Sequence, residues 1–103
     1  MGNTVKIKIE KKCDNFIEKS FGLMFHRKAK TTLFVNAKES KVIIHTFFLF
    51  FPIDVYWLDS NKLIISKEVL KPFSVSKSNN AKYLVETAKG LTEANIGDKF
   101  EFH

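Results

Sequence analysis

The sequence is poor in the residues that cross-link a small chain or hold metals and phosphates. Cys13 is the only cysteine, so no internal disulfide forms, which is typical of a protein in a reducing cytoplasm. The four glycines are isolated and form no phosphate-binding loop, and no histidine or cysteine pair has the spacing of a zinc site. No motif places a nucleophile beside a base. We therefore expect no metal, no cofactor and no catalytic residue.

Long apolar runs are also absent. Residues 1–10 lack the apolar segment of an export signal. The apolar run from Val42 to Phe51 contains His45 and Thr46 and ends at Pro52, whereas a membrane helix needs roughly 20 apolar residues. We therefore expect a cytoplasmic protein without a membrane span.

Arginine is nearly missing as well. Of 17 basic residues, set against 11 acidic ones in a chain of formal charge +6, Arg27 is the only arginine. Bidentate recognition of phosphate or guanine favours arginine, and evenly spread lysines are typical of a solvated surface. Nucleic-acid binding stays open as an alternative, because a positive field attracts polyanions.

What the chain does contain is β-forming sequence. Val5, Ile7 and Ile9 alternate with charged residues, which predicts a half-buried strand with a lysine-rich outer face. The stretch from Val42 to Asp59 is rich in aromatic and β-branched residues and predicts a central pair of strands. Its apolar part, up to Phe51, does not alternate cleanly, which indicates burial on both faces. Further strands are predicted at residues 31–36, 63–69, 81–86 and 99–102, with a hairpin joining 55–58 to 63–66.

These elements predict one domain over residues 1–103. Its expected architecture is mostly β: an antiparallel sandwich or partly closed barrel of about six to eight strands. A short helix is expected at residues 14–21, with Asp14 as its N-cap, and one helical turn at 91–95. Polar segments predict a turn at 37–41 and a loop at 74–80.

Asp54 is the most informative single residue, because it is a carboxylate in a stretch that otherwise favours burial. A buried carboxylate must be paired or must shift its pKa. In one interpretation Asp54 has a structural role and pairs with Arg27 or accepts turn amides after Pro52. In the other, Asp54, Arg27 and His45 meet at one polar end of the sheet, with His26 nearby, and face a ligand.

Four aromatic side chains are candidates for an exposed binding surface: Phe48, Phe50, Tyr56 and Trp57. Aromatic rings beside lysines are typical of proteins that stack on the bases of single strands. The same composition is typical of an ordinary β core, since a chain this short needs many of its aromatic residues inside.

Three segments, in this order, resemble a family known as domain of unknown function 192. Gly22 to Phe25 resembles the family's GLMFR signature, and Pro52 to Val55, followed by Leu58 and Asp59, is similar to its IPLD segment. The last segment, similar to the family's AKYVLEL…GD ending, consists of Ala81, Lys82, Tyr83, Glu86, Gly90, Ile96, Gly97 and Asp98. The resemblance implies a compact, mostly β domain and no established activity.

Two departures from the family pattern concern candidate residues. His26 stands where the family has arginine, and Phe48 stands where it has asparagine. If that asparagine lines a pocket in relatives, the resemblance implies that the pocket is more apolar here, or missing.

We expect a non-enzymatic binding or accessory module for a small ligand or a protein partner, as a monomer or homodimer. Its candidate ligand residues are Arg27, His45, Asp54 and His26. The alternative is a nucleic-acid-binding domain that uses its lysines and the aromatic strand.

Overall fold

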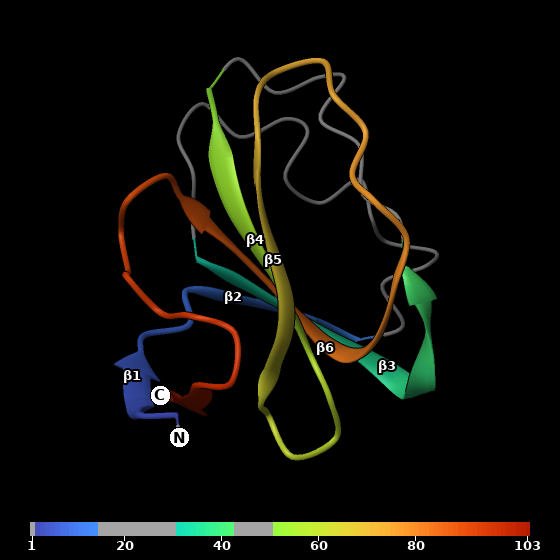
Figure 1. Cartoon of the computed structure of the whole chain (residues 1–103), viewed down its shortest axis with the longest axis vertical. Helices are drawn as coiled ribbons and strands as arrows, with labels where there is room; N and C mark the ends of the chain where they lie inside the picture. The colour runs from blue at the N-terminus through green and yellow to red at the C-terminus, as the bar shows by residue number, and fades with distance from the viewer. Residues whose placement is uncertain (1, 15–30, 43–50) are drawn as a thin grey trace.

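The structure is a computed structural model that describes residues 2–14, 31–42 and 51–103. Every regular element in these ranges is a strand, which confirms the predicted mostly β class (Figure 1). The strands are β1 (Thr4–Ile7), β2 (Lys11–Asp14), β3 (Thr32–Val42), β4 (Ile53–Leu58), β5 (Ile64–Leu70), β6 (Asn79–Ala88) and β7 (Lys99–Phe102).

Five of the strands form one sheet in the order β2-β3-β6-β4-β5, and β1 pairs with β7 in a separate ribbon. The predicted β4–β5 hairpin is present, with Trp57 opposite Ser66 and Ile53 opposite Leu70. The pairs within β3–β6–β4–β5 are antiparallel, whereas β2–β3 and β1–β7 are parallel. Among the described strands the sheet is open, so the barrel form of the prediction is wrong.

Two hydrophobic cores lie on opposite faces of the five-stranded sheet. What we call the first core consists of Phe34, Val42, Ile53, Val55, Trp57, Leu70, Ala81 and Leu84. The second core fills the space between the sheet and the β1–β7 ribbon and consists of Ile7, Leu33, Tyr56, Leu58, Ile64, Val85, Ala94 and Phe100. Successive residues of β4 alternate between the two cores, so both faces of this strand are buried.

The ribbon explains the alternating sequence at the N-terminus. Ile7 is buried in the second core, Val5 and Ile9 are half-buried, and the lysines between them are exposed. β1 is not an unpaired edge, since its residues lie opposite those of β7, from Thr4 with Lys99 to Ile7 with Phe102. In Figure 1 the two ends of the chain therefore lie beside each other.

Some local predictions are wrong. Residues 37–41, expected as a turn, lie within β3, because a register shift between Val35 and Ser40 lets this polar stretch continue the pairing with β6. Residues 91–95 form no helical turn. Asp14, expected as an N-cap, is the last residue of β2, and whether it also caps a helix stays a prediction, because the residues after it lie outside the described ones. The rest of the predicted helix, and residues 43–50 of the central run, lie outside the described residues.

No helix in the described parts of the chain is both long and apolar enough to cross a membrane.

The Asp98 carboxylate links the residue before β1 to the turn before β7 through two hydrogen bonds. Its Oδ1 accepts the backbone N–H of Asn3 at 2.9 Å, and its Oδ2 accepts that of Asn95 at 2.8 Å. The hydrogen bond from Asn3, followed by that from Asn95, holds the pKa of the Asp98 carboxyl below its usual value. The ionised carboxylate therefore stabilises the fold above the ordinary pKa, and this stabilisation is lost as the pH falls through the lowered one.

We predict that Asp98→Asn lowers the free energy of unfolding at pH 7, and that its deficit relative to the wild type shrinks as the pH falls below about 4. Urea denaturation between pH 3 and pH 7 measures both effects. Glu101→Gln, an exposed change on β7, is the matched control. Equal stability of Asp98→Asn and the wild type at pH 7 would show that the two hydrogen bonds contribute nothing.

Candidate functional site

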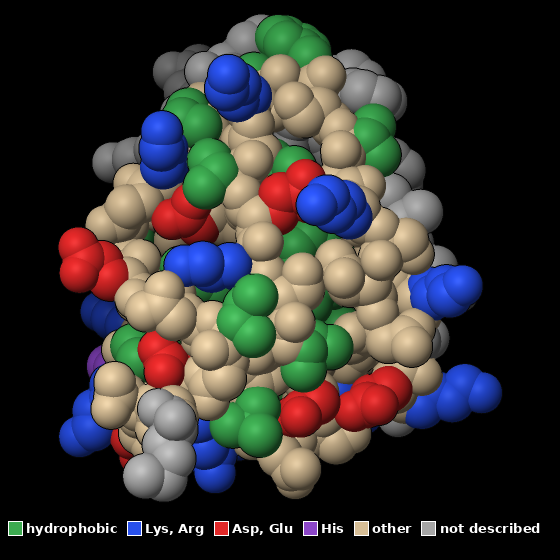
Figure 2. Space-filling model, viewed as in Figure 1, with side chains coloured by type: hydrophobic (Ala, Val, Ile, Leu, Met, Phe, Trp, Pro, Cys, Tyr) green, Lys and Arg blue, Asp and Glu red, His purple; other side chains and the backbone are tan. Residues whose placement is uncertain are grey.

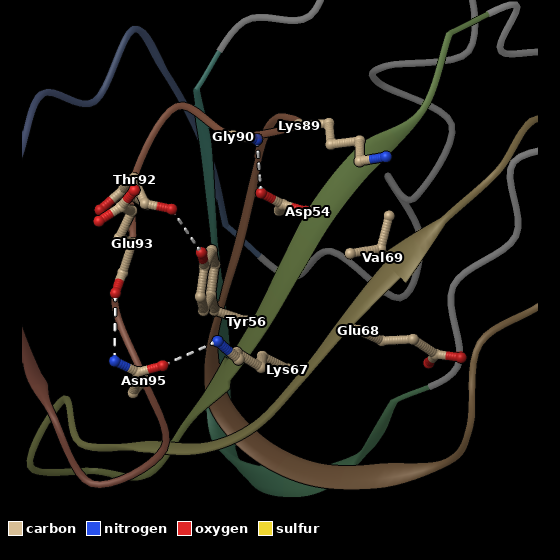
Figure 3. Close-up of a pocket in the computed structure, with 10 residues that line it drawn as sticks. All are labelled: Asp54, Tyr56, Lys67, Glu68, Val69, Lys89, Gly90, Thr92, Glu93 and Asn95. Carbon is tan, nitrogen blue, oxygen red and sulfur yellow. Dashed lines mark hydrogen bonds between the residues drawn. The ribbon is translucent and has the colours of Figure 1, made fainter.

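A cleft of about 550 Å³ lies between the β4–β5 hairpin and the segment that follows β6 (Figure 3). It lies on the sheet face that carries the second core. Its lining residues are Asp54, Tyr56, Lys67, Glu68, Val69, Lys89, Gly90, Thr92, Glu93 and Asn95. We call it the Asp54 cleft.

Strand register brings the floor of the cleft together. Asp54 lies directly opposite Val69, and Tyr56 lies opposite Lys67, so the four side chains share one face of the hairpin. Because the turn from Asp59 to Lys62 closes this hairpin, residues eleven or more positions apart in the sequence become neighbours.

Gly90 holds the outer wall in place. Its φ of +80° is a left-handed conformation that residues with a side chain rarely adopt, and it turns the chain back over the hairpin after β6. The Gly90 N–H donates to Asp54 Oδ2 at 2.9 Å. Asp54 therefore accepts a backbone N–H from a turn. The structural interpretation expected that turn directly after Pro52, whereas the turn observed follows β6.

Tyr56 forms the inner wall. Only 3% of its surface is exposed, its ring packs edge-on against Phe100 with centroids 5.1 Å apart, and its hydroxyl donates to the Thr92 carbonyl at 3.2 Å. Burial, and to a smaller extent the charge of Asp54, raises the pKa of Tyr56 to about 12. The hydroxyl therefore stays protonated at physiological pH and acts as a hydrogen-bond donor, not as a base.

The two lysines of the cleft differ. Lys67 Nζ donates to the Ala94 carbonyl and to Asn95 Oδ1, both at 3.1 Å, and so fastens the outer segment to β5. Lys89 is exposed and makes no hydrogen bond or ion pair with any described residue (Figure 3). The Glu93 carboxylate is likewise exposed at the rim. The cleft thus offers groups of both charges to a ligand.

The other predicted site residues divide into two groups. Arg27, His26, His45, Phe48 and Phe50 lie outside the described residues, so their proposed meeting with Asp54 stays a prediction. Trp57 is fully buried in the first core, and Tyr56 reaches the cleft with little more than its hydroxyl. Their prediction as exposed aromatic residues is wrong, because β4 is an interior strand with a core on each face.

One unusual residue was missed by the sequence reasoning. Glu86 lies on the central strand β6, between Thr32 of β3 and Val55 of β4, and only 3% of its surface is exposed. Burial raises the pKa of its carboxyl to about 8. Leu84, two residues earlier and fully buried, lies on the same face of β6, and this alternation is the signal that predicts burial at position 86.

No cluster of three or more histidine, cysteine, aspartate or glutamate side chains lies in the described parts of the chain. In the described parts of the chain, the fold and the cleft define a small β domain with an open mixed sheet and a polar cleft that carries side chains of both charges.

Comparison with known proteins gives the family. The model of DUF192, described as "Uncharacterized ACR", matches residues 1–102, and the chain belongs to this family, which confirms the resemblance. A UPF0127 protein of Pyrococcus furiosus is 37% identical over 99% of this chain and 92% of its own length. Its counterpart in Pyrococcus horikoshii is 34% identical over 86% of this chain and 83% of its own length. No solved structure matches the chain significantly.

We predict that Asp54→Ala lowers the free energy of unfolding by about 1 kcal/mol, the typical net value of one hydrogen bond, because Asp54 is half-buried and accepts one amide. Asp54→Asn, which keeps an acceptor oxygen, is the control and should cost less. Urea denaturation at pH 7 gives both values. A loss of roughly 3–5 kcal/mol would instead indicate that Asp54 forms a buried ion pair.

Glu86 gives a second prediction. Because its folded pKa of about 8 lies above the ordinary 4.5, the folded state binds its proton more tightly than the unfolded chain does. The free energy of unfolding of the wild type should therefore fall as the pH rises from 5 to 8, by up to about 1 kcal/mol per pH unit.

Glu86→Gln removes the titrating group and should flatten this part of the profile. Urea denaturation from pH 5 to pH 9 tests the difference between the two proteins, with exposed Glu101→Gln as a control that keeps the wild-type slope. Parallel profiles for Glu86→Gln and the wild type would mean that Glu86 is not a buried neutral acid.

Proposed function

We propose that this domain is a non-enzymatic binding module that takes a small zwitterionic molecule in the Asp54 cleft. The observation that supports this most is that the same cleft offers a carboxylate and an ammonium group to a ligand. Among the described residues, Asp54 accepts a hydrogen bond only from the Gly90 amide, through Oδ2, and Lys89 has no partner.

The shape of the cleft suits a small molecule. Ligand pockets typically enclose about 300–1,000 Å³, and the volume here, about 550 Å³, lies within that range. Val69, which is exposed, supplies an apolar wall for a hydrocarbon part. A ligand ammonium group pairs with Asp54 and Glu93, while its carboxylate pairs with Lys89.

A binding role accounts for the cleft better than catalysis does. The Tyr56 hydroxyl is held protonated, and the lining residues include no histidine, cysteine or serine to act as nucleophile or base. The cleft therefore lacks the histidine that most often acts as a general base, and recognition accounts for its lining better.

Nucleic-acid binding has less support. Tyr56 and Trp57, two of the four aromatic residues on which that alternative relied, are buried. The Asp54 cleft carries three carboxylates, from Asp54, Glu68 and Glu93, against the two ammonium groups of Lys67 and Lys89, so it repels a polyanion. On the face shown in Figure 2, basic and acidic side chains are interspersed and form no continuous basic patch.

The test is an amide NMR titration with L-valine as the zwitterionic probe. Amide signals of Asp54, Gly90 and Glu93 should shift with L-valine, and N-acetyl-L-valine amide, which lacks both charges, should leave them in place. Asp54→Asn and Lys89→Gln should each weaken binding about twofold to fivefold, the effect of losing one partly exposed charge pair.

Lys8→Gln removes a lysine from outside the cleft and serves as the charge-matched control. Equal shifts with the uncharged probe, or unchanged affinity in both cleft variants, would contradict the proposal. A single-stranded oligonucleotide, added at low and at physiological salt, tests the alternative, since shifts that survive salt would favour nucleic acid.

A further inference from the structure

A second cleft, of about 500 Å³, lies on the same sheet face at its opposite edge. Its lining residues are Ile9, Lys12, Leu33, Val35, Lys62, Tyr83, Phe102 and His103. It lies where the end of the β1–β7 ribbon meets β2, β3 and β6. We call it the Phe102 cleft. We propose that it binds a small organic anion whose flat apolar body lies on Phe102 and Tyr83 and whose charged group pairs with Lys12 and Lys62.

The floor of this cleft consists of partly buried hydrophobic residues at the edge of the second core. Five hydrophobic residues pack against that core while only partly buried, and four of them, Ile9, Val35, Tyr83 and Phe102, line the cleft. The rings of Tyr83 and Phe102 meet at 62° with centroids 5.8 Å apart, which makes a shallow aromatic corner. An apolar ligand body that covers this corner removes further hydrocarbon surface from water.

The rim is electrostatically one-sided. Lys12 and Lys62 line it, no aspartate or glutamate is among the lining residues, and neither ammonium group has a carboxylate partner in the described parts of the chain. This is the opposite of the Asp54 cleft, where carboxylates outnumber ammonium groups. A complementary ligand therefore carries a negative charge beside its apolar part.

Lys62 supplies an independent observation. Its φ of +66° is a left-handed conformation, which glycine or asparagine adopts far more readily than lysine. The turn fixes it there, since its N–H donates to the Asp59 carbonyl and its own carbonyl accepts the Phe100 N–H. In this position its Nζ lies 5.3 Å from the centre of the Phe102 ring. Backbone strain of this kind is common at ligand sites.

The test uses three probes of one shape: 2-naphthoate, 2-naphthyl phosphate and uncharged 2-naphthalenemethanol. Amide signals of Ile9, Lys12, Tyr83 and Phe102 should shift with the anions and far less with the alcohol. Comparison of the two anions tells whether a carboxylate or a phosphate is preferred. Equal affinity for the alcohol, or shifts confined to the Asp54 cleft, would overturn the proposal.

Lys62→Asn separates binding from folding. Asparagine tolerates the left-handed backbone, so the variant should unfold at the same or a higher urea concentration than the wild type. Its affinity for 2-naphthoate should nevertheless fall about fivefold, as should that of Lys12→Gln, while Lys8→Gln binds like the wild type. Unchanged affinity in Lys62→Asn and Lys12→Gln, with the fold intact, would show that the lysines do not hold an anion.

Discussion

The burial of both faces of the β6–β4 pair is the constraint on which the rest of the structure depends. β6 is the central strand of the five-stranded sheet, and β4 runs antiparallel beside it with every residue from Val55 to Leu58 buried. Burial opposite Val55 leaves Glu86 of β6 no exposed position for its carboxyl, and the raised pKa keeps it a neutral acid near neutral pH. The Trp57 Nε1–H on the same face also lacks a hydrogen-bond partner among the described residues. Such groups cost stability, and the hydrocarbon packed around them offsets that cost.

Polar groups gather where this two-sided burial ends. One cross-strand row runs through Lys12, Leu33, Val85, Tyr56 and Lys67, each directly opposite the next in register. The interior of the row is apolar and belongs to the second core, whereas its two ends are lysines that line different clefts. The β1–β7 ribbon packs over the second core between them. The strand register that aligns the core residues therefore also positions the lysine at the edge of each cleft.

The sequence predicted best what depends on local periodicity. The alternation at Val5, Ile7 and Ile9, the β4–β5 hairpin and the final strand from Lys99 to Phe102 all appear in the structure. The prediction also selected Asp54, since a carboxylate in an aromatic stretch is conspicuous. It failed where tertiary pairing decides, as at residues 37–41, where a bulge lets a polar segment remain in β3. The clefts were missed for the same reason, because no local pattern indicates the parallel pairing that brings Lys12 of β2 beside β3, or the path of the chain that places Lys89 over the hairpin.

The two clefts differ in the charge of their lining: carboxylates outnumber ammonium groups in the Asp54 cleft, whereas the Phe102 cleft has two lysines and no acidic side chain. The formal charge of the chain, +6, therefore does not describe either cleft. Net charge acts at long range and is weakened by salt beyond about 8–10 Å, so it selects little at close contact. Lys12 and Lys67 are separated by four interstrand steps, or about 19 Å at the usual spacing. At that distance each cleft is governed by its own side chains: carboxylates at Asp54 and Glu93, and ammonium groups at Lys12 and Lys62. The proposed selectivity therefore rests on the local arrangement at each edge of the sheet, and the two proposed ligands would not compete for the same groups.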